Sequence, residues 1–177
     1  MARPSMRSMV AAGAQTLVIT PTMPVRNVKE LIALARAKPH QINFASSGAF
    51  GPTHLAGELL KSLAKIDIVH VPYKGGGPAA IALMGGEIAM IFGEQATIIQ
   101  HVKSGKMKAI AVTSAKRALA MPDLPTVQET GIAGYDVTSW NGQFAPAGMP
   151  TEIVRRLNSE FNRIITTPEM RKRMIEN

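Results

Sequence analysis

The chain has 177 residues, of which 46% are hydrophobic and 18% charged, a composition typical of a globular protein with a substantial core. It contains no cysteine, which excludes a disulfide framework, a thiolate nucleophile and a cysteine metal site. The net charge of +8, from 20 basic and 12 acidic residues, permits anionic partners. The basic residues form no stripe interleaved with aromatic side chains, so we expect no binding to nucleic acid.

The N-terminal segment MARPSMRSMVAAGAQ resembles a signal peptide only weakly. Its apolar stretch after Arg7 is short and is broken at Gln15. We therefore read no convincing export signal in this segment. No apolar run in the sequence approaches the length of a membrane span.

The first two thirds of the sequence alternate between strand and helix patterns. Short apolar, β-branched runs predict strands at Thr16–Thr20, Ile42–Ser46, Ile66–Val71, Ile88–Phe92 and Met107–Thr113. Apolar residues at helical spacing predict helices between Asn27 and Pro39, at Thr53–Ala64, within Gly75–Gly86 and over 96–104. Asn27 and Glu30 have the spacing of a capping box. Because the connections are short, the alternation predicts an α/β fold with a parallel-type sheet flanked by helices.

The regularity weakens after Ser114. The patterns predict a short helix at Thr126–Thr130, strands at YDVTSW and GQFAP, a helix at Glu152–Ile165 and a last helix from Pro168. The chain begins almost on a strand and stops inside this last helix, without a capping signal. We therefore expect it to be the middle part of a longer protein.

The stretch SSGAFGPTH joins a predicted strand to a predicted helix. Ligands of open α/β sheets bind beyond the carboxyl ends of strands, and the amides of a helix N-terminus favour anions. The candidate ligand-binding residues here are Ser46, Ser47, Gly48, Gly51, Thr53 and His54. The stretch is equally well explained as a strand-to-helix turn with Thr53 near the N-cap, and both interpretations stay open at this point.

Two further strand ends carry polar and glycine residues. VPYKGGGPA supplies Tyr73, Lys74, Gly75 and Gly76, and FGEQAT supplies Glu94 and Gln95. The glycine run matches neither a Walker A loop nor a dinucleotide fingerprint. Since parallel strands end at one edge of a sheet, these segments predict a binding cleft lined by backbone amides.

The sequence predicts no catalytic set, metal or cofactor. It has no G-x-S-x-G elbow. His54, His70 and His101 lack the spacing of zinc ligands, and His40 falls in a predicted loop. His70 alternates within a strand, which favours a structural role.

Longer segments of the sequence are similar to a known family. HLAGELLKSLAKIDIVHVPYKGGGPA, KSGKMKAIAVTSAKRALAMPDLPTVQETG and SWNGQFAPAGMP closely resemble the Bug proteins. These are the extracytoplasmic solute-binding components of tripartite tricarboxylate transporters. The resemblance runs from about Met6 to the end of the chain. The combination of VPYKGG, AVTSAKR, DLPTV and APAG is far more specific than any one of these motifs.

The resemblance implies the second domain of a type II periplasmic binding protein. Such a protein has two α/β domains, holds a small carboxylate between them and delivers it to a membrane permease without acting as an enzyme. The ligand contacts of this domain correspond to Ser46–His54, Tyr73–Gly76 and Gly93–Thr97. We accordingly expect residues 1–20 to be a crossover from a missing first domain, 21–140 the ligand-binding domain, and 141–177 crossover and C-terminal helices.

The chain departs from the family in ways that leave alternatives open. Many members have Asp after the phenylalanine of the third strand end, where this chain has Gly93. A missing first domain would expose apolar surface, so we expect a homodimer or a swapped assembly. One alternative is therefore a self-associating assembly module with lost or vestigial solute binding. Another is an enzyme that uses His54 or Glu94 as its base.

Overall fold

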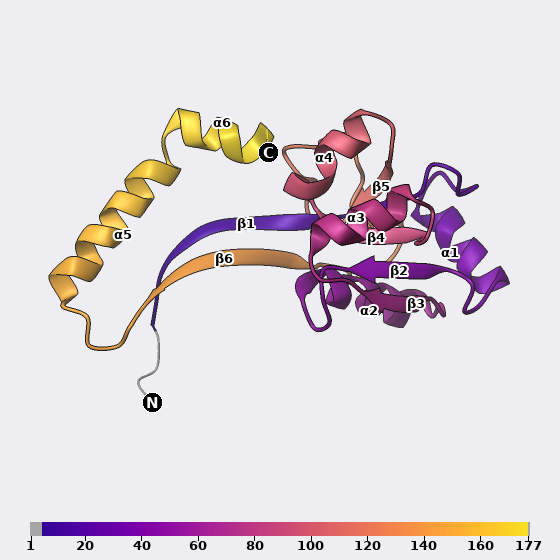
Figure 1. The fold of residues 1–177 in the computed structure, drawn as a ribbon, viewed down its shortest axis with the longest axis horizontal. Helices are drawn as coiled ribbons and strands as arrows, with labels where there is room; N and C mark the ends of the chain where they lie inside the picture. Colours follow the sequence, from indigo (N-terminus) through magenta and orange to yellow (C-terminus); the bar gives the residue numbers. More distant parts are fainter. Residues whose placement is uncertain (1–4, 177) are drawn as a thin grey trace. The chain divides into compact units, whose positions relative to one another are not determined.

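The computed structural model describes residues 5–176 (Figure 1). It contains two compact units, of which one is Gly13–Thr138 and the other is formed by the chain on either side. The expected crossover over residues 1–20 lies only partly within the described residues, which exclude residues 1–4 and Asn177. Its assignment, like that of the other two domains, stays a prediction.

The secondary structure follows the predicted order. The strands are β1 (Ser5–Ile19), β2 (Asn43–Ser46), β3 (Val69–Pro72), β4 (Met90–Glu94), β5 (Lys108–Val112) and β6 (Thr138–Ala145). The helices are α1 (Val28–Ala37), α2 (Pro52–Ala64), α3 (Gly76–Met84), α4 (Gln95–Lys103), the 3-10 helix η1 (Gln128–Thr130), α5 (Thr151–Ile165) and α6 (Pro168–Glu176). The predicted α/β fold with helices flanking a sheet is confirmed.

The strands form a six-stranded mixed sheet in the order β3-β2-β4-β1-β5, and β6 pairs with β1. β2 is parallel to β3 and to β4, whereas β1 is antiparallel to β4 and to β5. β2, β3, β4 and β5 therefore all run in one direction, as predicted for strands joined by helical crossovers. The exception is β1, which lies between β4 and β5 and is antiparallel to both, although α1 joins it to β2.

Some element boundaries differ from the prediction. YDVTSW and GQFAP do not form separate strands, because β6 continues through Asn141 and Gly142 without a turn. β1 extends from the predicted Thr16 back to Ser5. β3 begins only at Val69, because Ile66 and Ile68 are buried in the core before the chain reaches the ladder.

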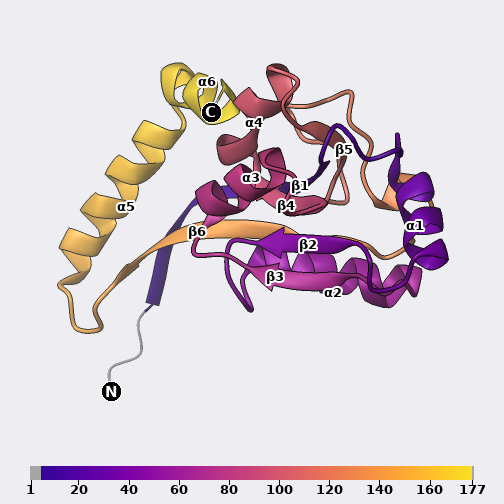
Figure 2. The ribbon, with the colours of Figure 1, turned by 45° about the vertical axis from the view of Figure 1, so that its right-hand side comes forward.

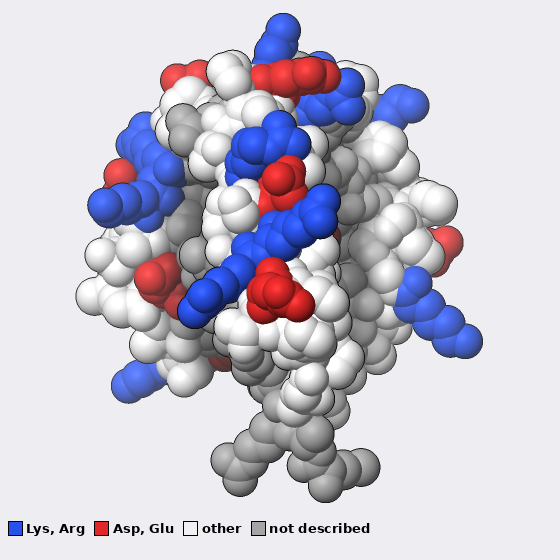
Figure 3. Space-filling model, turned by 90° about the vertical axis from the view of Figure 1, so that its left-hand side faces the viewer, with Lys and Arg blue, Asp and Glu red and all other residues white. Residues whose placement is uncertain are grey.

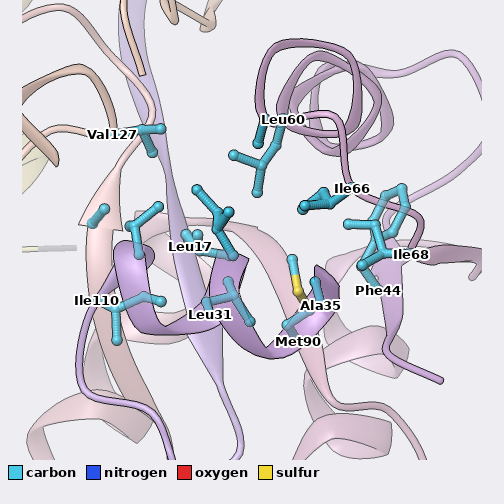
Figure 4. Close-up of a cluster of buried hydrophobic side chains, with 14 of the residues drawn as sticks. Leu17, Leu31, Ala35, Phe44, Leu60, Ile66, Ile68, Met90, Ile110 and Val127 are labelled. Carbon is cyan, nitrogen blue, oxygen red and sulfur yellow. The ribbon is translucent and has the colours of Figure 1, made fainter. Parts of the chain in front are cut away.

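Buried side chains on the two faces of the sheet form separate core clusters. Alternation along β1 places Leu17 and Ile19 on the face covered by α1 and α2, and Val18 on the face covered by α3 and α4. The first cluster contains Leu31, Phe44, Leu60 and Met90 among others (Figure 4). Burial of these side chains fixes the sheet and so determines where each strand ends.

The second unit contains α5 and α6 together with parts of β1 and β6. Ion pairs join Arg163 to Glu160 at 2.8 Å and Arg173 to Glu169 at 2.9 Å. Figure 3 shows Lys and Arg side chains interspersed with Asp and Glu on one face of the molecule. Among the helices that the structure describes, none is long and apolar enough to span a membrane.

Candidate functional site

The carboxyl ends of β2, β3 and β4 meet at one edge of the sheet. Ser46, the last residue of β2, pairs with Pro72, the last residue of β3. β4 lies on the other side of β2 in parallel register, with Ala45 opposite Ile91 (Figure 2). We call this edge the rim and define it as Ser46–Gly51, Tyr73–Gly76 and Glu94–Thr97. The structure thus brings the three predicted segments to one edge, while binding by their residues stays a prediction.

Internal hydrogen bonds fix the conformation of the first rim segment. The Ser47 amide donates to Thr53 Oγ1 at 3.0 Å, and the two hydroxyl groups lie 2.9 Å apart. The N-cap of α2 is Gly51, and Pro52 follows it as the first helical residue, so Thr53 lies in the first turn, near the N-cap as the turn interpretation expected. The Thr53 hydroxyl therefore stabilises the loop, and the half-buried Ser47 is the more accessible hydroxyl of the pair.

The second rim segment continues the ladder between β2 and β3. The Tyr73 amide donates to the Ser46 carbonyl at 3.1 Å, and the Gly75 amide donates to the Ser47 carbonyl at 3.0 Å. Gly75 has φ +109°, a conformation that a residue with a Cβ adopts only under strain. This requirement explains one glycine of the GGG run. Lys74 is exposed beside it.

The third rim segment depends on a close approach between β4 and α4. A Cβ on Gly93 would lie 2.6 Å from Ile98 Cγ2, so only glycine fits at this position. Gly93 therefore lets α4 begin directly at the end of β4, with Glu94 exposed at its N-cap. Gln95 follows, and its Nε2 is buried with no hydrogen-bond partner among the described residues.

The rim helices α2, α3 and α4 begin without a side-chain capping hydrogen bond, and only α4 has a carboxylate, that of Glu94, at its N-cap. None of these three helices, all within the described chain, has a side-chain hydrogen bond at its N-cap or an acidic residue in its first turn. First-turn amides of a helix lack intrahelical partners and carry the positive end of the helix dipole. The rim is therefore suited to an anion bound through backbone amides.

A histidine pair lies behind the first rim segment. The rings of His54 and His70 stack with centroids 3.9 Å apart, and Phe44 packs against both. His54 Nδ1 accepts a hydrogen bond from the Phe50 amide at 3.0 Å. Burial, and secondarily the neighbouring His54, lowers the pKa of His70 from its ordinary value. His54 thus positions the loop, and its predicted ligand contact stays untested.

One serine–histidine contact could not be predicted from sequence spacing. Ser46 Oγ lies 2.7 Å from His70 Nε2, but Ser46 is only 1% exposed and its hydroxyl also bonds the Gly48 backbone. Such a serine is closed to a substrate while the loop keeps this conformation. Among the described residues, no group of three or more His, Asp or Glu side chains is placed to hold a metal ion.

Sequence reasoning missed Phe50. Its side chain is 85% exposed, and its backbone φ is +63°. A large aromatic residue within a glycine-rich turn was the available signal.

The chain matches one family model over nearly its whole length. The model described as tripartite tricarboxylate transporter family receptor matches residues 5–177. A protein from the tcbD-tcbE intergenic region of Pseudomonas sp. (strain P51) is 36% identical over 155 residues, covering 87% of this chain and 46% of the relative. BugT of Bordetella pertussis is 32% identical over 155 residues, covering 88% and 48%. The chain thus spans about half the length of the curated relatives it matches.

Solved structures share the same fold. A protein of R. palustris with adipate superposes with a TM-score of 0.94 at 30% identity, covering 99% of this chain and 58% of that one. The periplasmic binding protein BugD gives 0.90 at 31%, with 99% and 58% covered. MatC of Rhodopseudomonas palustris with bound malate gives 0.88 at 27%, with 98% and 59% covered. Together with the family match, these likenesses confirm the resemblance read from the sequence: this chain belongs to the tripartite tricarboxylate transporter receptor family.

Proposed function

We propose that the rim captures a small carboxylate without covalent chemistry, as part of a solute-binding protein for a tripartite tricarboxylate transporter. The observation that carries this proposal is the convergence of the α2, α3 and α4 N-termini, without side-chain caps or first-turn acids, at one edge of the sheet. Backbone amides bind a carboxylate through charge-assisted hydrogen bonds. Ser47, Tyr73 and Gln95 add polar side chains at the same edge.

The structural neighbours support this ligand class. Two of them contain adipate and malate, which are both small dicarboxylates. Glu94 lies exposed at the start of α4, where its carboxylate opposes a second anion. We therefore place the ligand carboxylate at the N-termini of α2 and α3 rather than at the N-terminus of α4.

The wider role also follows as a proposal from family membership. The matched family is described as a receptor of a tripartite tricarboxylate transporter, and the neighbour BugD is named a periplasmic binding protein. We infer that this chain delivers its ligand to membrane permease components of such a transporter and that it is periplasmic. Because the curated relatives are about twice as long, we expect the chain alone to bind weakly.

Amide NMR titration tests the rim directly. Isotope-labelled chain would be titrated with succinate, malate, adipate and citrate at millimolar concentrations, with uncharged 1,4-butanediol as the control. We expect shift changes concentrated at Ser47–Gly51, Tyr73–Gly76 and Glu94–Thr97, and none with the diol. Shifts confined to other surfaces, or none with any carboxylate, would refute the proposal.

Self-association is a second candidate, favoured by one helix. α5 exposes Ile153, Leu157 and Ile164 at between 42% and 46%, although apolar residues at this spacing normally face a core. We propose that this face supports a homodimer of the isolated chain. Light scattering should show a concentration-dependent dimer that Leu157→Glu abolishes and that Leu119→Glu, in the loop after β5, retains. A monomer at every concentration would exclude it.

A further inference from the structure

Among the large apolar side chains whose exposure the structure describes, Phe50 is the most exposed. At 85% exposure it contributes almost nothing to the core, unlike Phe44 and Phe92, which are buried at the same end of the sheet. Its chain neighbours Ala49 and Gly51 are small and leave the ring uncovered. The packing of the described chain therefore gives no reason for an aromatic residue at this position.

The conformation of Phe50 is nevertheless held firmly. Its backbone adopts φ +63°, which is unfavourable for a residue with a bulky side chain. Its amide donates to His54 Nδ1 at 3.0 Å, and its ring meets the His54 ring edge-on, with centroids 5.8 Å apart and planes at 83°. A strained backbone that persists through specific contacts points to a role for the ring that it presents.

The anchor of Phe50 extends into the core. His54 stacks on His70 with ring centroids 3.9 Å apart and lies parallel to Phe44 at 6.5 Å. Phe44 is fully buried and packs edge-on against Phe92. A continuous set of ring contacts therefore connects the exposed Phe50 to the sheet, and the ring is presented in a defined orientation rather than as a loose side chain.

Phe50 also lies directly beside the proposed carboxylate site. It immediately precedes Gly51, the N-cap of α2, and follows Ser47 and Gly48 in the same rim segment. The hydrocarbon part of a carboxylate bound at the α2 N-terminus begins two bonds away from the bound oxygens. The nearest large apolar surface of this loop is the Phe50 ring.

We propose that Phe50 is a specificity-determining residue that packs against the hydrocarbon part of the ligand and so favours carboxylates with an extended aliphatic or aromatic body. This inference rests on the proposed function and adds the selection between ligands. The α2 amides recognise the carboxylate, and the ring recognises the methylene or aromatic carbons next to it. Removal of such carbons from water favours binding by about fourfold for each fully buried methylene.

Pairs of ligands with the same charge and different hydrocarbon parts distinguish recognition of the carboxylate by the α2 amides from recognition of the hydrocarbon by the Phe50 ring. Succinate and adipate carry the same two carboxylates and differ by two methylenes, and acetate and benzoate form a second pair. For the unaltered chain we expect adipate to bind at least about fourfold more tightly than succinate in amide NMR titrations. The adipate methylene protons should show nuclear Overhauser contacts to the Phe50 ring.

Phe50→Ala is the decisive variant. We expect its preference for adipate over succinate to fall below about twofold, while its affinity for succinate changes by less than about twofold. Phe50→Leu, which keeps an apolar side chain, should retain part of the preference for adipate but lose the extra preference for benzoate. The matched control is Leu119→Ala, because Leu119 is 81% exposed in the loop after β5, outside the rim.

The outcomes keep the two proposals apart. If neither succinate nor adipate shifts the rim amides of any variant, the proposed function itself fails. If carboxylates bind and Phe50→Ala keeps the full preference for adipate, only the role of Phe50 is refuted. Equal loss of both ligands in Phe50→Ala also refutes it, because the residue would then shape the loop instead of contacting the hydrocarbon.

Discussion

Helices begin at both ends of this sheet, but they begin in different ways. α1 starts beyond β1, at the end opposite the rim, and has a complete polar cap: Asn27 accepts from the Glu30 amide at 2.9 Å, and the Glu30 carboxylate accepts from the Arg26 amide at 2.7 Å. The N-cap residues of the rim helices are Gly51 in α2, Gly75 in α3 and Glu94 in α4. None of the three makes a side-chain capping hydrogen bond. At the end opposite the rim, side chains therefore accept hydrogen bonds from the N-terminal amides of the helix. At the rim, no N-cap side chain does so.

This contrast indicates that the capped end of the sheet serves stability and that the rim serves binding. A capped N-terminus is worth about 1 kcal/mol to the fold, and an uncapped one leaves amides available to an anion. Glycine at the N-cap costs only a few tenths of a kcal/mol relative to the best capping residues. The lack of side-chain caps at the rim therefore costs little stability. Changes at the capped end should alter the free energy of unfolding, whereas changes at the rim should mainly alter carboxylate affinity.

The largest effect should come from the packing that supports the rim. A Cβ on Gly57 would lie between 2.1 and 2.7 Å from atoms of the Phe44 ring, which is fully buried. Gly57→Ala should therefore push α2 off the sheet and lower the free energy of unfolding by about 2–3 kcal/mol, since overpacked cores lose this much. Urea denaturation measures the change.

Gly77→Ala is the matched control for this variant. A Cβ on Gly77, in the first turn of α3, would meet no atom within 4 Å. We expect the stability to rise by up to about 1 kcal/mol, because alanine favours the helix. A Gly57→Ala chain as stable as the unaltered one would mean that α2 does not need this close contact.

Adding a capping side chain at the rim should increase stability and weaken carboxylate binding. Gly51 has φ −78° and ψ 170°, a conformation open to any residue, and a Cβ there would lie an ordinary 3.6 Å from the Gly48 carbonyl oxygen. Gly51→Asp should stabilise the chain by a few tenths of a kcal/mol. It should weaken carboxylate binding about tenfold or more, because its carboxylate occupies the α2 amides and repels the ligand.

The neutral cap Gly51→Asn separates these two effects. It should stabilise the chain to a similar degree and weaken binding less than Gly51→Asp does. Unchanged carboxylate affinity in both variants, measured by amide NMR titration, would show that the α2 N-terminus does not contact the ligand.

Removing the cap at the opposite end should affect only the fold. Asn27→Ala deletes the side chain that accepts from the Glu30 amide, and we expect a loss of about 1 kcal/mol in unfolding free energy. Carboxylate affinity should stay within about twofold of the unaltered chain. Asn27→Ser, which keeps a capping oxygen, should restore most of the stability. A binding defect in Asn27→Ala would contradict the separation between the two ends.

How much could be predicted from the sequence depended on the range of the interactions. The α1 cap was predicted correctly because Asn27 and Glu30 are close in sequence and the chemistry is local. The convergence of the three rim segments was also predicted, since parallel strands end at one edge. The antiparallel direction of β1 was not, because its pairing with β4 joins residues far apart in the chain.

Several side-chain roles at the candidate site were beyond sequence reasoning. Thr53 bonds to Ser47 because Pro52 moves the helix start to Gly51, and Ser46 meets His70 only through the pairing of β2 with β3. The exposure of Phe50 depends on the positive φ of a single residue. The Ser46–His70 contact is tertiary, and the other two features depend on local backbone conformations that residue spacing alone does not encode.

The smallest expected effect concerns the pH dependence of the fold behind the rim. Burial lowers the pKa of His70 below its ordinary 6.5; among its α2 neighbours, His54 and Lys61 lower it further and Glu58 raises it. The unfolded chain therefore binds a proton at this residue more readily than the folded chain. The resulting stability is complete above about pH 6.5 and is lost as the pH falls from there through the lowered folded pKa.

The NMR titration of the His70 ring should give a pKa below 6.5. The variant His70→Gln should reduce the loss of stability between pH 7.5 and 5.5, whereas His101→Gln, in the last turn of α4, should not. A His70 pKa at or above 6.5 would mean that burial does not desolvate this ring in its stack against His54 and Phe44.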